Sequence, residues 1–356
     1  MQYKLLGSTG LRVSELCLGA MTFGEDWDWG ANAATSRAIF EAFAEAGGNF
    51  IDTANIYTNG TSEKLLGEFL RTERDRFVVA TKYTMMTNPN DPNSSGNQRK
   101  NLMRSLDASL KRLNTDYIDL YWVHMWDTVT PVEEIMRTLD DVVRAGKVMY
   151  VGISDAPAWI ISRAQTLAEL RNMTPFAAIQ LEYNLVERTV ERDLLPMAED
   201  LNLSVLDWSP LGGGVLTGKY LNQDLGNDNR LNKAEYFEQH YKGDRAMHIA
   251  QAVVKIANEL GISPAQVALA WIRHQSPRHI PIIGARTLDH LKDNLDCLKV
   301  SLTQDQLTHL NQISEVELGF ALRFLRKLQP MFLGAATETL NLRLHPTSRM
   351  VLDRQE

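Results

Sequence analysis

Short apolar runs that alternate with helix-type segments are the feature of this chain that most constrains its fold. The runs are rich in β-branched and aromatic residues, and apolar residues recur at helical spacing in the segments between them. Such alternation is typical of β/α units, whose parallel strands are buried on both faces. We expect strands at residues 15–18, 50–52, 77–82, 117–124, 148–154, 178–182, 204–208 and 280–283. We expect helices at residues 34–46, 61–70, 98–113, 131–145, 158–171, 190–199, 244–260, 264–274 and 288–297.

Several of the expected strands end in a polar residue, and these residues follow one another at fairly regular intervals: Asp52, Lys82, His124, Ser154 and Gln180. Eightfold repetition of one β/α unit predicts an α/β fold of the closed (β/α)8 TIM-barrel type, with an open doubly wound sheet as the alternative. In such a barrel the carboxyl ends of all strands meet at one mouth, where catalytic residues gather. We therefore expect these polar residues to share one site.

Tyr57, which follows Asp52 closely, adds a phenol to this set and indicates proton-transfer chemistry. The Lys82 ammonium favours tyrosinate, so we expect it to lower the pKa of Tyr57 towards neutrality, while Asp52 orients Lys82. His124 would donate a hydrogen bond to a carbonyl oxygen. Such a set suits proton transfer at that oxygen while hydride moves to or from the carbon. A structural ion pair, a core histidine and a packing tyrosine are the alternatives without catalysis.

Composition restricts the classes of protein to which the chain can belong. A length of 356 residues suits one large barrel domain, and 44% hydrophobic with 23% charged residues is ordinary for a globular enzyme. The formal net charge of −7 leaves no basic excess for nucleic acid or an acidic membrane. Two cysteines, Cys17 and Cys297, argue against a disulfide framework and indicate a reducing cytoplasm. Neither a signal peptide nor a bilayer-spanning apolar stretch is visible.

Three motifs carry a resemblance to a known family: Lys-Leu-Leu-Gly-Ser-Thr-Gly-Leu-Arg-Val-Ser at residues 4–14, Gly-Ala-Met-Thr-Phe-Gly at 19–24 and Trp-Ser-Pro-Leu-Gly-Gly-Gly at 208–214. With the order of Asp52, Tyr57, Lys82 and His124, they resemble the aldo-keto reductases, in the branch of aryl-alcohol dehydrogenases and potassium-channel β subunits. The resemblance runs from about residue 3 to about residue 320. It implies that the four residues are a catalytic tetrad and that the chain is an NADPH-dependent reductase of aldehydes and ketones.

The resemblance also implies an NADP(H) site across the barrel mouth. The carboxamide would be bonded by Ser154, Asp155 and Gln180, and Trp208 would stack on the nicotinamide ring. Ser209, Leu211 and Gly213 would line the pyrophosphate path, with charge from Lys219 and Arg230. Arg286 would meet the 2′-phosphate at the start of a helix, where free N–H groups favour phosphate. The remaining expected cofactor contacts are Gly19, Met21, Asp52, Gly284, His290, Asp293 and Asn294, the last two holding the adenine.

Two residues depart from the family's pattern: Asp155 stands where many relatives have Asn, and His290 where Gln is frequent. The chain has no Gly-x-Gly-x-x-Gly motif, which counts against the usual dinucleotide-binding fold. Residues 213–219 nearly spell a P-loop, but Tyr220 occupies the position of the magnesium-binding Ser or Thr. No convincing metal cluster is visible in the sequence, so hydride transfer with a nicotinamide cofactor is the expected chemistry.

Aromatic and sulfur-containing side chains after the strand ends predict a pocket for an aromatic or apolar carbonyl compound; they are Trp27, Trp29, Met85, Met86, Met125 and Trp126. A long loop at residues 209–243 is expected to be functional or mobile. A hairpin at residues 3–6 and 11–14 precedes the barrel, and by resemblance it would close the amino-terminal end. We expect a barrel domain at residues 1–317, and at 318–356 a C-terminal extension that is a lid, an oligomer contact or partly disordered.

Two other functions stay open on the sequence alone. A regulatory subunit of the same fold would bind the cofactor with little turnover. A barrel aldolase would use Lys82 as a Schiff-base nucleophile, although Asp52 would keep that amine charged. The expected partner is a small carbonyl substrate, without nucleic acid or membrane, and oligomerisation is left open.

Overall fold

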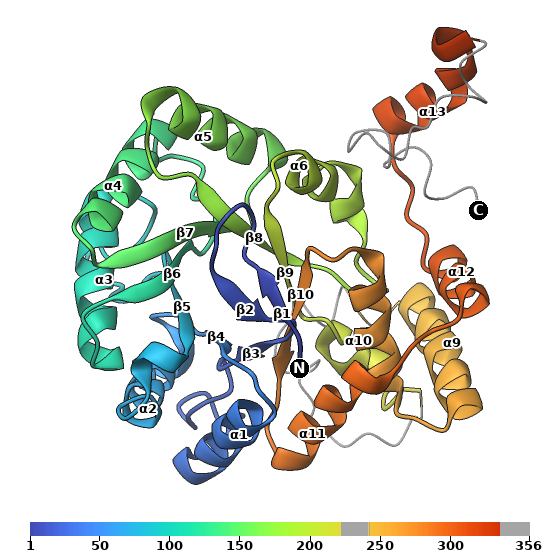
Figure 1. Cartoon of the computed structure of the whole chain (residues 1–356), viewed down its shortest axis with the longest axis horizontal. Helices are drawn as coiled ribbons and strands as arrows, with labels where there is room; N and C mark the ends of the chain where they lie inside the picture. Colours follow the sequence, from blue (N-terminus) through green and yellow to red (C-terminus); the bar gives the residue numbers. More distant parts are fainter. Residues whose placement is uncertain (222–240, 242, 335–356) are drawn as a thin grey trace.

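Eight parallel strands close into a barrel in the computed structural model, which describes residues 1–221, 241 and 243–334 (Figure 1). They are β3 (Cys17–Gly19), β4 (Phe50–Asp52), β5 (Val78–Tyr83), β6 (Ile118–Val123), β7 (Val148–Ser154), β8 (Phe176–Glu182), β9 (Ser204–Trp208) and β10 (His279–Gly284). Neighbours in the barrel follow chain order, and β10 pairs with both β9 and β3 to complete the ring. The expected (β/α)8 TIM barrel is therefore confirmed.

Helices surround the strands and cover their outer faces (Figure 1). The α-helices are α1 (Ala33–Glu45), α2 (Thr61–Phe69), α3 (Arg99–Leu113), α4 (Val132–Arg144), α5 (Ala158–Arg171), α6 (Leu194–Asp200), α9 (Asp244–Leu260), α10 (Pro264–Gln275), α11 (Leu288–Asp296), α12 (Gln304–Ile313) and α13 (Phe320–Leu333). Short 3-10 helices are η1 (Tyr57–Gly60), η2 (Arg74–Arg76), η3 (Thr189–Arg192), η4 (Gly212–Thr217) and η5 (Cys297–Lys299). One large apolar cluster joins outward strand residues such as Val79 to helix residues such as Leu106. Each such buried side chain stabilises the fold by roughly 1.5–3 kcal/mol.

The helix expected at residues 190–199 is divided into η3 and α6, with Asp193 at a non-helical φ of −145° between them. Pro196 explains the division. A continuous helix would place the proline ring against the carbonyl group of Arg192 and would lose one backbone hydrogen bond. With the break at Asp193, Pro196 falls in the first turn of α6, where no partner for its missing N–H is needed.

The expected N-terminal hairpin is present as β1 (Tyr3–Leu5) paired with β2 (Arg12–Ser14). Leu6 and Val13 are fully buried and pack with Trp122 and Leu206, which fill the barrel interior. At Gly7 the backbone has a φ of 54°, and a Cβ atom would lie 2.1 Å from the carbonyl oxygen of Ala177. Only glycine therefore lets the hairpin turn approach the start of β8 this closely.

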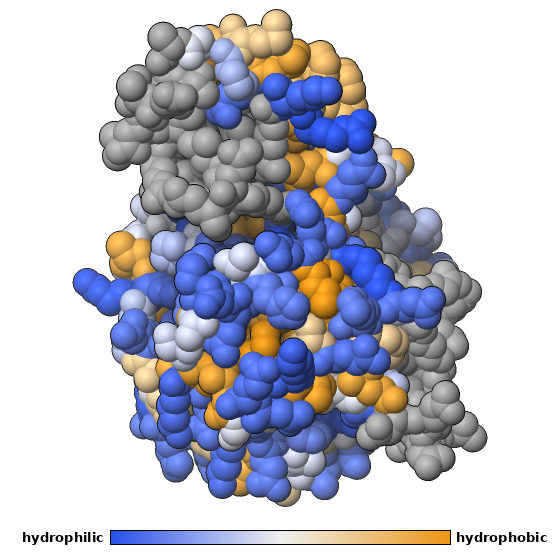
Figure 2. Space-filling view, turned by 90° about the vertical axis from the view of Figure 1, so that its right-hand side faces the viewer, coloured by the Kyte–Doolittle hydropathy of each residue, from blue (hydrophilic) through white to orange (hydrophobic). Residues whose placement is uncertain are grey.

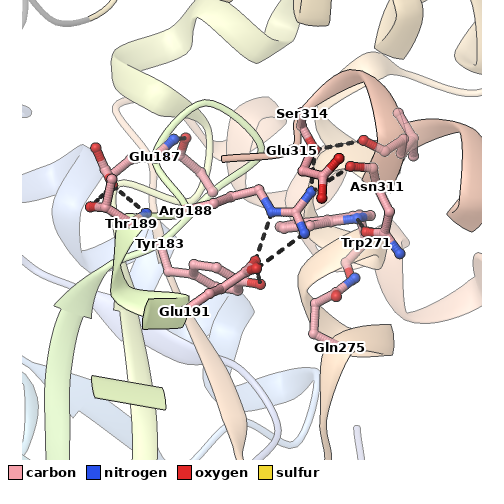
Figure 3. A network of polar contacts seen from close by, with 12 residues as sticks. Tyr183, Glu187, Arg188, Thr189, Glu191, Trp271, Gln275, Asn311, Ser314 and Glu315 are labelled. Atoms are coloured by element: carbon pink, nitrogen blue, oxygen red, sulfur yellow. Dashed lines mark hydrogen bonds and ion pairs between the residues drawn. The ribbon is translucent and has the colours of Figure 1, made fainter. Parts of the chain in front are cut away.

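Two arginines tie the loop after β8 to the end of α12. The guanidinium of Arg188, only 3% exposed, donates to the Ser314 hydroxyl (2.6 Å), the Asn311 carbonyl oxygen (2.9 Å) and Glu191 (2.7 Å). Figure 3 shows it between Glu191 on one side and Asn311 with Ser314 on the other. Arg245 adds bonds of 2.7 Å to the carbonyl oxygens of Val186 and Ser314. These contacts fix where the chain leaves the barrel.

Helix α13 follows that exit and lies away from the barrel (Figure 1). Its exposed side chains include Phe320, Phe324, Met331 and Phe332, each at least half accessible to solvent. Figure 2 shows hydrophobic surface gathered at this end of the molecule. Within the described residues, no helix has the length and apolar character needed to cross a membrane.

Candidate active site

The carboxyl ends of the barrel strands bring the polar residues together at one mouth. Parallel register aligns Gly19 with Asp52, and Ser154 with Gln180. Glu182 is aligned in the same way with Trp208. Because neighbouring strands end at the same level, residues far apart in sequence share this surface, as in other barrels of this type.

Lys82 lies at the centre of a buried group. Its side chain is fully buried, and its ammonium donates hydrogen bonds to Asp52, to the Thr53 carbonyl oxygen (2.9 Å) and to the Tyr57 hydroxyl (3.1 Å). A buried cation of this kind requires a counter-charge, and Asp52 supplies it. The three donors of the ammonium thus go to a carboxylate, a backbone carbonyl oxygen and a phenol.

The backbone that carries Tyr57 is strained. The next residues, Thr58 and Asn59, both have left-handed conformations, with φ of 45° and 54°. The Thr58 hydroxyl donates to the Phe23 carbonyl oxygen (2.6 Å) and accepts from the N–H of Ser62 (3.0 Å), which holds the turn in place. Strain of this kind is maintained only where surrounding contacts fix it, and it clusters at functional sites.

Electrostatics at Tyr57 differ from the sequence-based expectation. Burial raises the pKa of Tyr57 above its ordinary value, and the opposing effect of Lys82 does not offset this. The prediction that the pKa of Tyr57 falls towards neutrality is therefore wrong, because desolvation of tyrosinate exceeds its attraction to a cation that Asp52 already neutralises. Burial alone would lower the pKa of Lys82, but Asp52 and Tyr57 raise it, so the ammonium stays charged.

His124 adds a neutral imidazole to this group. Desolvation, helped by the nearby Lys82 charge, lowers the pKa of His124 to about 3. Its ring lies edge-on to the Tyr57 ring, with centroids 5.9 Å apart. The Nδ1 atom of His124 is buried and has no hydrogen-bond partner among the described residues.

The side chains expected to bind the nicotinamide carboxamide lie beside this group. The Gln180 amide donates to the second oxygen of Asp52 (3.1 Å), and the Trp208 indole N–H donates to Asp155 (3.1 Å). The Ser154 hydroxyl is buried and makes no hydrogen bond within the described chain. An unpartnered hydroxyl next to amide and carboxylate groups fits a ligand that carries both donors and acceptors, as a carboxamide does.

The segment after β9 offers a turn of backbone suited to an anion. Ser209 and Gly213 have left-handed φ values of 54° and 61°, and the Gly213 N–H donates to the Ser209 hydroxyl (3.1 Å). Lys219 is exposed, with its ammonium 4.8 Å from the centre of the Tyr220 ring. Leu211 is half-buried beside η4. Arg230, another expected contact, lies outside the described residues.

Of the expected cofactor contacts after β10, two are exposed and two are hydrogen-bonded within the protein. Arg286 and His290 are exposed at the start of α11, whose cap is the Thr287 hydroxyl. Asp293 instead accepts hydrogen bonds from Ser263 (2.8 Å) and Gln266 (2.7 Å), while Asn294 donates to the Gly284 carbonyl oxygen (3.1 Å). Adenine binding by Asp293 would therefore compete with contacts to the start of α10.

At the other end of the expected cofactor path, Met21 is half-buried, and Gly19 closes β3 with no room for a side chain. A Cβ atom there would lie 2.8 Å from the Ile282 side chain. Among the described residues there is no group of three or more His, Cys, Asp or Glu side chains placed to hold a metal ion.

The expected substrate residues occupy three places. Trp27 meets the Tyr57 ring edge-on at 6.3 Å and packs against Trp29 at 5.7 Å, so it borders the proposed reacting group. Met85, Met86 and Met125 line a cavity of about 430 Å³ together with Val129 and Asp127. Trp126 is half-buried and packs against the core cluster between barrel and helices.

Sequence reasoning missed two residues of this mouth, Glu182 and Tyr241. Glu182 is buried at the end of β8, where it accepts a hydrogen bond from the Tyr241 hydroxyl. The Asn184 amide also donates to that hydroxyl (2.9 Å). A polar residue that ends a buried strand is the same signal that identified Lys82, whereas the sequence around Tyr241 gives no such signal.

Comparison with known proteins identifies the family of the chain. Residues 15–315 match the family model described as "Aldo/keto reductase family". The chain is 37% identical over 331 residues to norsolorinic acid reductase of Aspergillus flavus, covering 90% of this chain and 83% of that protein. It is 36% identical over 338 residues to aryl-alcohol dehydrogenase [NADP(+)] of Phanerodontia chrysosporium, covering 89% and 86%. The chain belongs to the aldo/keto reductase family of nicotinamide-dependent oxidoreductases.

Proposed function

We propose that this protein catalyses the reversible, NADPH-dependent reduction of aldehydes and ketones, with Tyr57 as the general acid. The observation that carries the proposal is the Lys82 ammonium bonded to both Asp52 and the Tyr57 hydroxyl at the barrel mouth. When bound, the cofactor supplies the hydride. The protein's own part is to hold the carbonyl oxygen and deliver a proton to it.

Each residue of the tetrad has a distinct role in this proposal. Tyr57 is protonated at neutral pH because its pKa is raised, so it is ready to donate to the carbonyl oxygen. Lys82 then stabilises the tyrosinate left behind, through the 3.1 Å contact already present. Asp52 keeps Lys82 charged and fixed. His124, uncharged at neutral pH, donates a hydrogen bond that orients the carbonyl group.

Two findings support NADP over NAD. Arg286 is an exposed cation directly before the capped start of α11, where a phosphate is favoured by free N–H groups and the helix dipole. One relative bears the name aryl-alcohol dehydrogenase [NADP(+)].

We further propose that the substrate is aromatic or otherwise apolar. Trp27 borders Tyr57, and the cavity lined by Met85, Met86 and Met125 lies beside the same mouth. Flexible methionine side chains adapt to irregular apolar ligands. The relatives named for norsolorinic acid and for aryl alcohols are consistent with this class.

The test is NADPH oxidation with a panel of aromatic and aliphatic aldehydes, by the wild type and by Tyr57→Phe. Loss of the proton donor should reduce kcat by about 100-fold or more while NADPH affinity changes less than about twofold, because general acids contribute on this scale. Tyr150→Phe is the matched control, since Tyr150 lies towards the opposite end of β7.

Equal turnover by Tyr57→Phe and wild type would refute the role of Tyr57. Tight NADPH binding without turnover of any carbonyl compound would instead favour a regulatory subunit of the same fold.

A further inference from the structure

Asp155 occupies a constrained position at the barrel mouth. It directly follows β7 and has a left-handed φ of 44°. Its N–H donates to the Gln180 carbonyl oxygen (3.3 Å), and its own carbonyl oxygen accepts from the N–H of Trp126 (3.4 Å). Its carboxylate accepts the Trp208 indole N–H at 3.1 Å. Backbone contacts therefore fix the residue, and the edge of the indole fixes one carboxylate oxygen.

We propose that the Asp155 carboxylate makes the site distinguish the oxidation states of the cofactor, favouring the cationic oxidised nicotinamide over the neutral reduced ring. The inference rests on the proposed function, because it takes Ser154, Gln180 and Trp208 as the nicotinamide end of an NADP(H) site. A negative charge bonded to the edge of the stacking indole attracts a ring that carries positive charge. Asparagine in its place would keep the hydrogen bonding without the charge.

The other charged groups near Asp155 have hydrogen-bond partners within the protein, and the Lys82 ammonium is paired with an opposite charge. Lys82 from β5 is paired with Asp52 from β4, and it also bonds Tyr57 of η1. Glu182 of β8 accepts from the Tyr241 hydroxyl. The Asp155 carboxylate accepts a hydrogen bond from the neutral Trp208 indole, and the residue is exposed to solvent. Asp155 is therefore well placed to contribute a net charge to the mouth.

The discrimination should depend on pH near neutrality. Desolvation at the mouth raises the pKa of Asp155 to about 6. Hydrogen bonding from the Trp208 side chain and the Lys82 charge oppose this rise, and the Glu182 charge adds to it. Below that pH the side chain is neutral and the preference for oxidised cofactor is lost; above it the preference is complete. The raised pKa values of Tyr57 and Lys82 and the lowered pKa of His124 keep these groups from titrating in this range. Both oxidation states of the cofactor carry the 2′-phosphate. Its titration therefore changes both dissociation constants equally and leaves their ratio unchanged.

The experiment measures dissociation constants of NADP⁺ and NADPH for the wild type and for Asp155→Asn between pH 5 and pH 8. For the wild type, affinity for NADP⁺ relative to NADPH should rise about tenfold over this range, as expected for one pKa unit of coupling to an adjacent charge. For Asp155→Asn the ratio should stay at its low-pH value. Calorimetry near pH 6 should detect proton release on NADP⁺ binding to the wild type alone. Asparagine tolerates the left-handed backbone, so the variant should fold.

Asp305→Asn, at the exposed start of α12, serves as the matched control and should behave as the wild type. If the wild type binds neither cofactor form, the proposed function falls, and this inference with it. If both forms bind and Asp155→Asn keeps the wild-type ratio and pH dependence, only the inference is overturned. The inference would also be overturned if the affinity ratio lost its pH dependence in Glu182→Gln but kept it in Asp155→Asn.

Discussion

Arg286, before the start of α11, is the residue that we propose sets the preference for NADPH over NADH. Its side chain is exposed, and Thr287 behind it caps α11 by accepting the N–H of His290 (3.2 Å). Within the described part of the chain, Arg286 has no ion pair that would occupy its guanidinium. A phosphate at this point would meet both the guanidinium and the positive end of the helix dipole.

Replacing Arg286 by alanine should weaken NADPH binding about tenfold or more, since hydrogen bonds to charged groups contribute about 1.5–3 kcal/mol. NADH lacks the 2′-phosphate, so its affinity should change less than about threefold. Titration of both cofactors by fluorescence measures the two constants. Arg171→Ala, at the exposed end of α5, is the control. Equal losses for NADPH and NADH would rule out the 2′-phosphate assignment.

Sequence reasoning works at the residue scale where position along a strand determines the surroundings. Asp52 and Lys82 were identified because each ends a buried apolar run, and the structure brings them into contact. The direction of the pKa shift at Tyr57 could not be obtained in this way, because the desolvation of the phenol depends on contacts that sequence spacing does not reveal. The same limit applies to Asp293, whose carboxylate is engaged by residues at the start of α10.

Among the structural elements, the loop after β8 depends most on one buried side chain. Arg188 bonds a carbonyl oxygen and a hydroxyl of the α12 end, and its guanidinium lies 5.2 Å from the centre of the Trp271 ring of α10. Three elements therefore meet at one cation (Figure 3). Removing Arg188 would leave its polar neighbours buried without hydrogen-bond partners, and unpaired buried polar groups lower the free energy of unfolding strongly.

Arg188→Ala should lower the free energy of unfolding by about 3–5 kcal/mol. Arg163→Ala is the matched control, because its pair with Glu133 is about half exposed on both sides. Such exposed pairs contribute about 0–1 kcal/mol. Urea unfolding followed by circular dichroism measures both values. Similar losses for the two variants would show that the buried network does not stabilise the loop.

The positions of most helices and strands are predictable from the periodicity of apolar residues, and breaks within them are caused by particular residues. Pro196 could have divided the helix expected at 190–199, since a proline marks a helix start when it lies in the first turn. Helix α12 also had a usable signal. Thr303 and Gln306 form a capping box, in which each side chain bonds the backbone N–H of the other. Helix α13 lacks such a cap, and its apolar residues gave no indication of what they pack against.

At the scale of the whole molecule, the repeated pattern of strands and helices predicts that the barrel closes. The same pattern does not predict how far each end of the chain stabilises the barrel. The N-terminal hairpin is bound to the barrel by the buried Leu6 and Val13. In contrast, the three apolar clusters of the described chain extend no further than Leu310. We therefore propose residues 1–317 as the folding unit and residues 318–356 as an extension.

A chain ending at residue 317 should keep the stability of the full protein to within about 1 kcal/mol. The described contacts that it loses include the ion pair between Arg323 and Glu317, which is exposed on both sides and therefore weak. The Arg192 bond to the Glu317 carbonyl oxygen (2.8 Å) is retained, as are both arginine contacts to Ser314. Thermal unfolding with and without NADPH measures stability and cofactor binding together. Removal of the exposed Phe320, Phe324 and Phe332 should also reduce self-association, which light scattering on both chains detects. Loss of cooperative unfolding in the shorter chain would show instead that the extension belongs to the folded core.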